Sequence, residues 1–332
     1  ITKKGKSGKG KIEFDTYFGT QAPAKVIEMM NSAEFINMMN EASANDGYID
    51  NWFSDPNSFN FIGDPNDPEL TNTDWYDEIL RDDAPISNYS LSASGGSDKF
   101  SYYVNGSFFD QDGFQKGTSY NRMSARTNLD AQVNDILKIG TNVMITRSDS
   151  KSTVGDNSLY GVMINALAAD PTMPVQEEDG TYAATFSYFS WWAFENPRAA
   201  TDIYERNTFT NRFLGSVFAE LSIAPGLKFR TSWSADYQNL EDQLYYPSTT
   251  LQAIRGGITG LGQYASAETI TWLNENTLNY NFSFGTPHNL SLLAGFTMQE
   301  TDQDFVDLTG ENFANDNLGA IDLAADITNG ST

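Results

Sequence analysis

Carboxylates are the first group of side chains in this sequence whose spacing could do chemistry. Residues 64–69 read Asp-Pro-Asn-Asp-Pro-Glu, which places Asp64, Asp67 and Glu69 within six positions stiffened by two prolines. Calcium takes six to eight oxygen ligands, and carboxylates are its usual donors. The run is therefore a weak calcium candidate, with an ordinary solvated loop as the alternative. A second acidic run, Asp110-Gln-Asp-Gly, has Asn121 where a calcium loop needs a bidentate glutamate, and we interpret it as a turn.

Aromatic rings form a second group, concentrated between residues 186 and 194. Broad ring faces give large contact areas, so they could stack on sugar rings or peptide side chains, although packing between loops or docking of a partner protein explains them as well. The candidates for contact with a ligand or a partner are Trp52, Phe53, Tyr188, Phe189, Trp191, Trp192 and Phe194.

A short amphipathic helix is expected over residues 32–43. Asn31 is a suitable N-cap, and Glu34 three positions later completes a capping box. Phe35, Ile36 and Met39 then follow at helical spacing and form one apolar stripe. The stripe either packs on its own loop or contacts a partner.

The sequence gives little support for a catalytic site. The chain has no cysteine, and its one histidine, His288, lies in a short turn with no convincing triad around it. We therefore expect neither an enzyme nor a cofactor, calcium excepted. The formal charge of −24 is concentrated in residues 22–85, 150–205 and 302–332, and nucleic-acid binding is unlikely because phosphate contacts need clustered lysine and arginine.

Strands must position these groups. Nine segments alternate in character with period 2: 10–21, 86–95, 98–109, 118–133, 136–148, 207–224, 227–239, 264–284 and 288–301. Tight turns and long connections follow each other in strict order along them. That order is typical of an outer-membrane β-barrel, which has short turns on one side and long loops on the other.

The alternation gives each strand two unlike faces. In residues 118–133, Arg122, Arg126 and Asn128 lie on one side, while Met123 and Leu129 lie on the other. A soluble sheet would pack its apolar face on a second sheet, a solenoid would repeat at fixed length, and a barrel would turn its apolar face to lipid. The repeat lengths vary, and the long strands favour the barrel over a soluble cell-surface β-sandwich, an adhesin or a carbohydrate-binding module.

The alternation of short and long connections then gives the orientation of the sheet in the membrane. With the tight turns on the periplasmic side, the external loops are 22–85, 150–205, 240–263 and 302–332. Nine strands would leave two unpaired edges, which lipid does not tolerate, so we expect this sheet to be a piece of a larger barrel.

Several stretches resemble the SusC/RagA-type TonB-dependent transporters of Bacteroidetes outer membranes. The most specific is Ser-Ala-Ser-Gly-Gly-Ser-Asp-Lys at 92–99, followed by Asp-Gln-Asp-Gly at 110–113. The others, in family order over about the first 200 residues, are 1–6, 31–42, 74–79, 124–130, 137–140, 170–175, 180–182 and 195–197.

The resemblance implies a function as well as a fold. Residues 1–9 would end the plug domain, and 10–332 would form the N-terminal part of a barrel of about twenty-two strands. It implies import of oligosaccharides or peptides across the outer membrane, a SusD-like surface lipoprotein as partner, and energy from TonB through a segment outside this chain. It is also consistent with a dimer of the transporter–lipoprotein pair.

Overall fold

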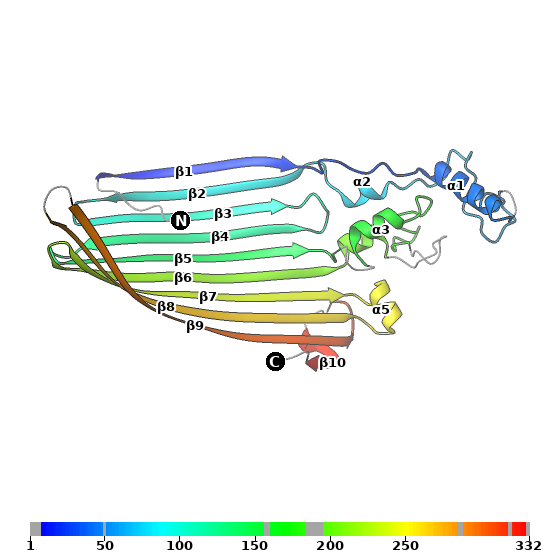
Figure 1. Cartoon of the computed structure of the whole chain (residues 1–332). Coiled ribbons are helices and arrows are strands. Elements are labelled where there is room, and N and C mark those ends of the chain that lie inside the picture. Colours follow the sequence, from blue (N-terminus) through cyan, green and yellow to red (C-terminus); the bar gives the residue numbers. More distant parts are fainter. Residues whose placement is uncertain are drawn as a thin grey trace.

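The described part of the chain folds as one antiparallel sheet whose ten strands follow each other in sequence order (Figure 1). The computed structural model describes residues 8–48, 51–155, 160–183, 195–284, 288–317 and 321–329. The strands are β1 (Gly8–Gln21), β2 (Ala84–Gly96), β3 (Phe100–Asp112), β4 (Ser119–Gln132), β5 (Leu137–Ser152), β6 (Glu205–Ala224), β7 (Leu227–Tyr246), β8 (Leu261–Phe284), β9 (His288–Phe313) and β10 (Ala324–Asn329).

Helices gather at one end of the sheet, where the long connections lie, and tight turns join the strands at the other end (Figure 1). The helices are α1 (Ser32–Asn45), α2 (Trp75–Ile79), α3 (Val162–Ala168), α4 (Pro197–Asp202), α5 (Leu251–Gly256) and the 3-10 helix η2 (Ile321–Leu323). We call these ends the loop end and the turn end. Among the described residues, no helix is long and apolar enough to cross a membrane.

The predicted all-β fold is confirmed, but two of the expected external loops, 240–263 and 302–332, are much shorter than predicted. Residues 302–313, expected in a loop, continue β9, and residues 324–329 form a tenth strand. Residues 240–246 and 261–263, also expected in a loop, belong to β7 and β8. Acidic and polar residues interrupt the apolar row in these extensions, but strand pairing uses the backbone and does not require an unbroken row.

The register places the side chains on two faces. Directly paired residues share a face, so Leu129, Thr141, Val217 and Trp233 lie in one row across β4 to β7. We call this side the apolar face; it also carries the residues Ile12, Leu91, Met123 and Phe296. Ile12 is 76 % exposed and Trp233 51 % exposed, and no second sheet covers them among the described residues. The soluble sandwich alternative therefore lacks its second layer in the described part of the chain.

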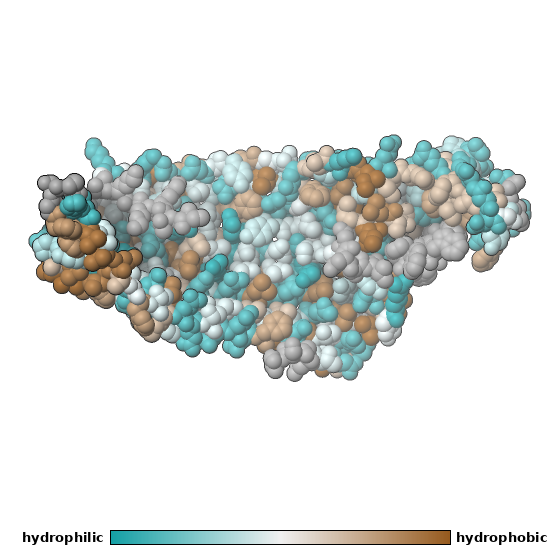
Figure 2. All heavy atoms as spheres, in the orientation of Figure 1, coloured by the Kyte–Doolittle hydropathy of each residue, from teal (hydrophilic) through white to brown (hydrophobic). Residues whose placement is uncertain are grey.

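The opposite side, the polar face, carries Arg122, Arg126, Asn142, Ser216 and Asp236. Figure 2 shows one side of the molecule, on which hydrophilic residues cover much of the middle, while hydrophobic residues gather at the turn end and again toward the loop end. The two faces of this sheet thus differ in side-chain chemistry.

The capping box predicted for α1 is present. The Asn31 side chain accepts a hydrogen bond from the Glu34 backbone N–H at 2.9 Å, and the Glu34 carboxylate accepts one from the Asn31 N–H at 3.0 Å. The helix therefore begins where the sequence predicts, and it extends two residues further, to Asn45.

The turn between β6 and β7 requires glycine at position 226. Gly226 has φ of +77°, and a Cβ there would lie 2.0 Å from the backbone oxygen of Asn281 in β8. The Asn281 N–H donates a hydrogen bond to the Gly226 oxygen at 2.8 Å. This bond holds the turn against β8, so the backbone cannot move away to make room for a side chain.

Replacing Gly226 with valine should destabilise the folded protein by about 2 kcal/mol, because valine is strained at this φ and its Cβ meets a backbone oxygen. Denaturant unfolding followed by tryptophan fluorescence would measure the change. Gly106→Val in β3 is the matched control, since a Cβ at Gly106 meets nothing within 4 Å. Equal losses in the two variants would contradict this account of the turn.

Candidate functional site

Charged side chains pair in a ladder along the polar face of β6 and β7. Arg212 donates two hydrogen bonds to Asp236, at 2.9 and 2.6 Å, and Arg206 donates two to Asp242, at 3.2 and 2.9 Å. Nearer the turn end, Lys228 bonds to Glu220 at 3.0 Å. Exposed pairs of this kind contribute roughly 0–1 kcal/mol each to stability. They fit a face that meets water or another polar surface.

A hollow of about 290 Å³ lies in the same face, toward the middle of the sheet. Asn142 donates to the Ser216 hydroxyl at 3.2 Å, and the Arg126 guanidinium contacts the Met144 sulfur at 3.3 Å. The rest of its lining comes from Asn128, Val143, Leu214, Gly215 and Ser234. Amides, hydroxyls and a guanidinium around one hollow can hydrogen-bond to a polar ligand or to a polypeptide segment.

The helices at the loop end enclose the main buried core. Trp75 and Ile79 of α2 pack with Val162 and Ala166 of α3 and with Ala200 of α4. The Trp75 indole N–H donates to the backbone oxygen of Asp170 at 3.0 Å. Segments almost a hundred residues apart are therefore held as one unit, which we call the loop cluster (Trp75, Ile79, Val162, Ala166, Met173, Ala200, Tyr204).

Glu195 joins the loop cluster to α5. Its carboxylate accepts hydrogen bonds from the Tyr204 hydroxyl and from the backbone N–H of Leu251, the latter at 2.7 Å. Burial raises the pKa of the Glu195 carboxyl above its usual range. A buried carboxylate with two donors thus connects the loop before β6 to the loop between β7 and β8.

Arg198 and Asp202 make a second connection on the surface of the loop cluster. Arg198 donates to Asp202 at 2.7 Å and to the backbone oxygen of Glu78 at 3.1 Å. The Tyr182 hydroxyl also donates to Asp202, at 2.7 Å, and burial together with this bond raises the pKa of Tyr182 to about 12. Tyr182 therefore stays protonated and remains a donor at neutral pH.

Beside the loop cluster, two buried polar side chains have atoms that lack a partner among the described residues. Asp170 uses one carboxylate oxygen for the Thr172 N–H and hydroxyl, each at 2.8 Å, while its other oxygen has no partner. The side-chain amide of Asn165 has none either. Burial raises the pKa of Asp170. The carboxyl is thereby biased toward its protonated form, which reduces the cost of burying it.

The predicted aromatic contacts lie in two places. Phe53 is buried, and the backbone N–H of this residue bonds to Asn40 of α1 at 2.9 Å. Trp52 is half-buried with its ring 4.7 Å from that of Tyr48. Phe53 thus packs within its own loop, and Trp52 retains a partly open ring. The others, Tyr188, Phe189, Trp191, Trp192 and Phe194, lie outside the described residues.

The predicted stripe of α1 is divided by its packing. Ile36 is fully buried within its own loop, whereas Phe35 and Met39 are half-buried. Phe35 lines an apolar hollow of about 300 Å³ with Met29, Met30 and Trp75. Ile36 can therefore support a partner contact only indirectly, while Phe35 is placed to make one.

The proposed calcium ligands do not converge. Asp64 accepts hydrogen bonds from Asn66, at 2.9 and 3.1 Å, and Asp67 accepts one from the Glu69 N–H at 2.9 Å, all within their own turns. In the described part of the chain, no group of three or more acidic, histidine or cysteine side chains could hold a metal ion. Calcium at Asp64, Asp67 and Glu69 stays a prediction.

Known proteins match this chain over nearly its whole length. TonB-dependent receptor P26 of Formosa agariphila is 30 % identical over 319 residues, which is 96 % of this chain and 30 % of that protein. TonB-dependent receptor P3 of the same organism is 32 % identical over 90 % of this chain and 28 % of its own length. The chain thus spans about 30 % of these relatives.

SusC of Bacteroides thetaiotaomicron, also a TonB-dependent receptor, is 26 % identical over 52 % of this chain and 19 % of its own length. The chain is homologous to SusC/RagA-type TonB-dependent transporters. No protein-family profile matches it.

Solved structures show the same fold. The RagAB peptide transporter superposes with a TM-score of 0.77 over 99 % of this chain and 40 % of that one, at 20 % identity. The RagAB peptide importer in its closed-closed state gives 0.75 over the same shares, at 21 % identity. The ten-stranded sheet thus corresponds to part of the barrel of a SusC/RagA-type transporter, as the sequence resemblance predicts.

Glu195→Ala should loosen the connection between the loop cluster and α5, because it leaves the Tyr204 hydroxyl and the Leu251 N–H buried without an acceptor. Each lost partner costs roughly 1–3 kcal/mol. Hydrogen exchange at the Leu251 amide should become about tenfold faster or more, since 1.4 kcal/mol corresponds to a factor of ten. Glu178→Ala, at an exposed position, is the control and should leave that rate unchanged.

The same connection should weaken as pH rises. Burial raises the Glu195 pKa above the usual glutamate value of 4.5, so between pH 4.5 and the raised pKa the folded loop holds a proton that the open loop releases. The free energy of local opening is therefore largest below pH 4.5 and falls as pH increases through the raised pKa. Hydrogen exchange across this range should show that slope, and Glu195→Gln should reduce it. An unaltered slope in the glutamine variant would exclude Glu195 as its source.

Proposed function

We propose that this chain forms part of the wall of an outer-membrane transporter that imports nutrients with energy from TonB. The observation that carries the proposal is the single sheet with two unlike faces. Its apolar face exposes large side chains on nine consecutive strands, and its polar face carries ion pairs and a hollow whose lining includes amides, hydroxyls and a guanidinium. A barrel wall needs this arrangement, with lipid on one side and a polar interior on the other.

Strand length supports a membrane-spanning role. A tilted strand needs about 9–11 residues to cross the hydrocarbon core, whereas β8 has 24 residues and β9 has 26. The excess lies at the loop end, where acidic residues interrupt the apolar row of β9 and the helices begin. The loop cluster would therefore stand above the membrane.

The cargo we propose is an oligosaccharide or a peptide. Homology to SusC and structural similarity to the RagAB peptide importer support import of a polymeric nutrient. The hollow around Arg126 and Asn142 lies on the face that would line the interior. It offers donors and acceptors to either class of cargo or to a plug domain.

A SusD-like lipoprotein is the partner we propose at the loop end. Phe35, with the half-buried ring of Trp52, offers apolar surface in the segment that extends furthest from the sheet (Figure 1). TonB would act through a segment outside this chain, and pairs of transporter and lipoprotein could associate as dimers.

Fractionation of cells that make the natural polypeptide tests the proposal. The protein should remain in the outer membrane after salt and alkaline washes, require detergent for extraction, and bring a lipoprotein with it. Deleting it should abolish growth on one class of oligosaccharide or peptide while growth on monomers continues. A protein released by salt alone, in the absence of detergent, would refute the proposal.

Trp191→Ala combined with Trp192→Ala should weaken ligand capture while barrel assembly continues, because the loss removes ring area that could stack on cargo. We expect the apparent affinity for the imported oligomer to fall by about tenfold, measured as concentration-dependent uptake by whole cells. Phe59→Ala is the control, since Phe59 is another external aromatic and is fully exposed. Unchanged uptake in the double variant would remove these two residues from the capture site.

A further inference from the structure

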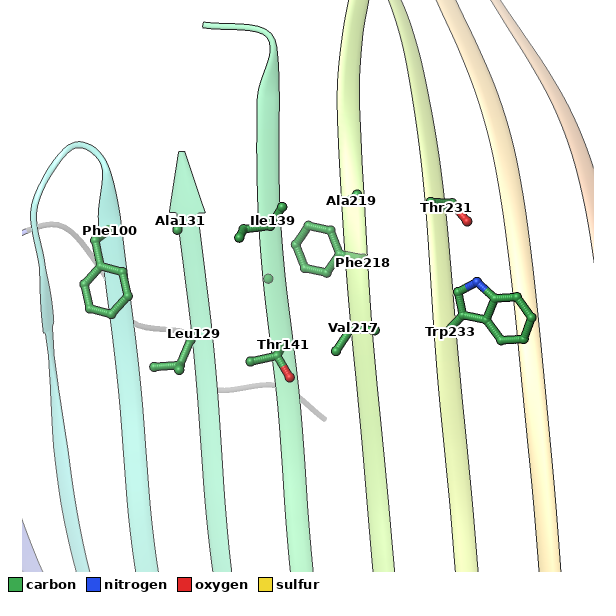
Figure 3. Close-up of a pocket in the computed structure, with 11 residues that line it drawn as sticks. Phe100, Leu129, Ala131, Ile139, Thr141, Val217, Phe218, Ala219, Thr231 and Trp233 are labelled. Carbon is green, nitrogen blue, oxygen red and sulfur yellow. The ribbon is translucent and has the colours of Figure 1, made fainter. Parts of the chain in front are cut away.

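A groove of about 500 Å³ crosses the apolar face near the turn end (Figure 3). Its floor contains small residues, Ala131, Gly140 and Ala219, and its ends are marked by the rings of Phe100 on β3 and Trp233 on β7. Both rings are exposed, Phe100 at 44 %. The groove thus runs across five strands rather than along one.

The register of the strands explains why this groove exists. Ala131, Ile139, Ala219 and Thr231 are direct partners across β4 to β7 and form one transverse row. The next row toward the loop end contains bulky Leu129, Val217 and Trp233, and the next row toward the turn end contains Leu221 and Phe229. Two alanines between bulky rows leave a channel in the surface.

The floor is sealed from the polar face. Phe218 points to that face directly beside Gly140, and a Cβ at Gly140 would lie 2.4 Å from its ring. The Arg230 guanidinium then covers the Phe218 ring at 3.8 Å from the ring centre. An occupant of the groove therefore meets carbon on its floor and has no path to the polar side.

The lining defines the class of occupant. The lining side chains are apolar apart from the hydroxyls of Thr141 and Thr231 and the indole N–H of Trp233, and no charged residue takes part. Adjacent strands lie about 4.8 Å apart, so four strand spacings give a length of about 19 Å. One leaflet of a bilayer core spans about 15 Å, so this length suits a single long acyl chain.

The turn beside the groove carries both signs of charge. Asp98 and Lys99 immediately precede Phe100, and both are exposed. No described carboxylate forms an ion pair with the Lys99 ammonium group. The backbone of Lys99 is held in place, because its oxygen accepts a hydrogen bond from the Gln132 N–H at 2.7 Å. A zwitterionic headgroup, with a phosphate and an amine, complements this pair of charges.

We propose that the groove is a binding site for one phospholipid, with its acyl chain lying across Ala131 and Ala219 and its zwitterionic headgroup at Asp98 and Lys99. The proposal rests on the proposed function, because it requires that the apolar face meets lipid. A phospholipid retained there would fill the groove continuously, whereas the acyl chain of a freely diffusing bilayer lipid would occupy it only transiently.

Photolabelling of the full natural protein in liposomes tests the site. The probe is phosphatidylethanolamine with a diazirine in one acyl chain, and adducts are mapped by mass spectrometry of peptides. We expect labelling of 129–141 and 217–219 to exceed labelling of the rest of the apolar face by at least fivefold. Native mass spectrometry in mild detergent should show one retained phospholipid.

Ala131→Leu with Ala219→Leu should fill the groove and reduce both signals at least fivefold. Ala125→Leu with Ala235→Leu is the matched control, because both residues lie on the same face outside the groove and are exposed. Lys99→Glu should weaken retention of the phospholipid without filling the channel. Folding of each variant is checked by the shift in gel mobility on heating.

The outcomes separate the two proposals. Even labelling of the apolar face of a detergent-dependent outer-membrane protein overturns the phospholipid site alone. Protection of 129–141 and 217–219 by another polypeptide, a second copy included, overturns it as well. A protein that dissolves without detergent and takes up no probe overturns both proposals. The wild-type map decides the matter even when the double-leucine variant fails to assemble.

Discussion

Backbone pairing between consecutive strands is the constraint on which the rest of this structure depends. Each of nine successive pairs is antiparallel and in direct register along most of its length. Because side chains alternate with period 2, a slip by one residue in any pair would turn a whole strand over. The register therefore decides that Leu129, Val217 and Trp233 share one face and that Arg126, Ser216 and Asp236 share the other. In lipid, this pairing also satisfies backbone groups that water cannot reach.

A different principle holds the loop end together. There the chain has no continuous ladder, and apolar side chains from distant segments pack around Trp75 while buried polar groups connect neighbouring loops. Glu195 reaches Tyr204 and Leu251, and Asp316 accepts from Tyr245 and Ser248 at 2.7 to 3.0 Å. Each of these carboxylates accepts hydrogen bonds from several donors, and in this way a single side chain holds separate loops together.

Much of the sheet could be predicted from the sequence because lipid-facing strands carry an apolar row of period 2. The row is clear in 118–133, and its strand is β4. The prediction failed where the row ends. Residues 302–313 carry Asp302, Asp304 and Asp307, which are typical of a loop, yet they pair with β8. Backbone pairing continues past the point where aspartates interrupt the apolar row, and the sequence pattern cannot distinguish such a strand end from a loop.

The candidate site was less predictable for a related reason. Local signals gave the capping box at Asn31 and Glu34, since both partners lie within one turn of helix. Glu195 gave no such signal, because its donors are 9 and 56 residues away and only the folded loops bring them together. Three acidic residues in a row of six, by contrast, were conspicuous in the sequence but satisfy their own turns at Asp64 and Asp67.

The two faces of the wall are coupled at Gly140. This residue has no side chain, so the Phe218 ring from the polar face can lie against the strand, and the Arg230 guanidinium can cover that ring. Arg230 is also 3.8 Å from Glu220, which Lys228 contacts as well. A stack of ring, guanidinium and carboxylate therefore closes the polar side at the place where the apolar side is hollowed. A one-layer wall has no core to absorb a local loss of volume, so a hollow on one face must be backed by packing on the other.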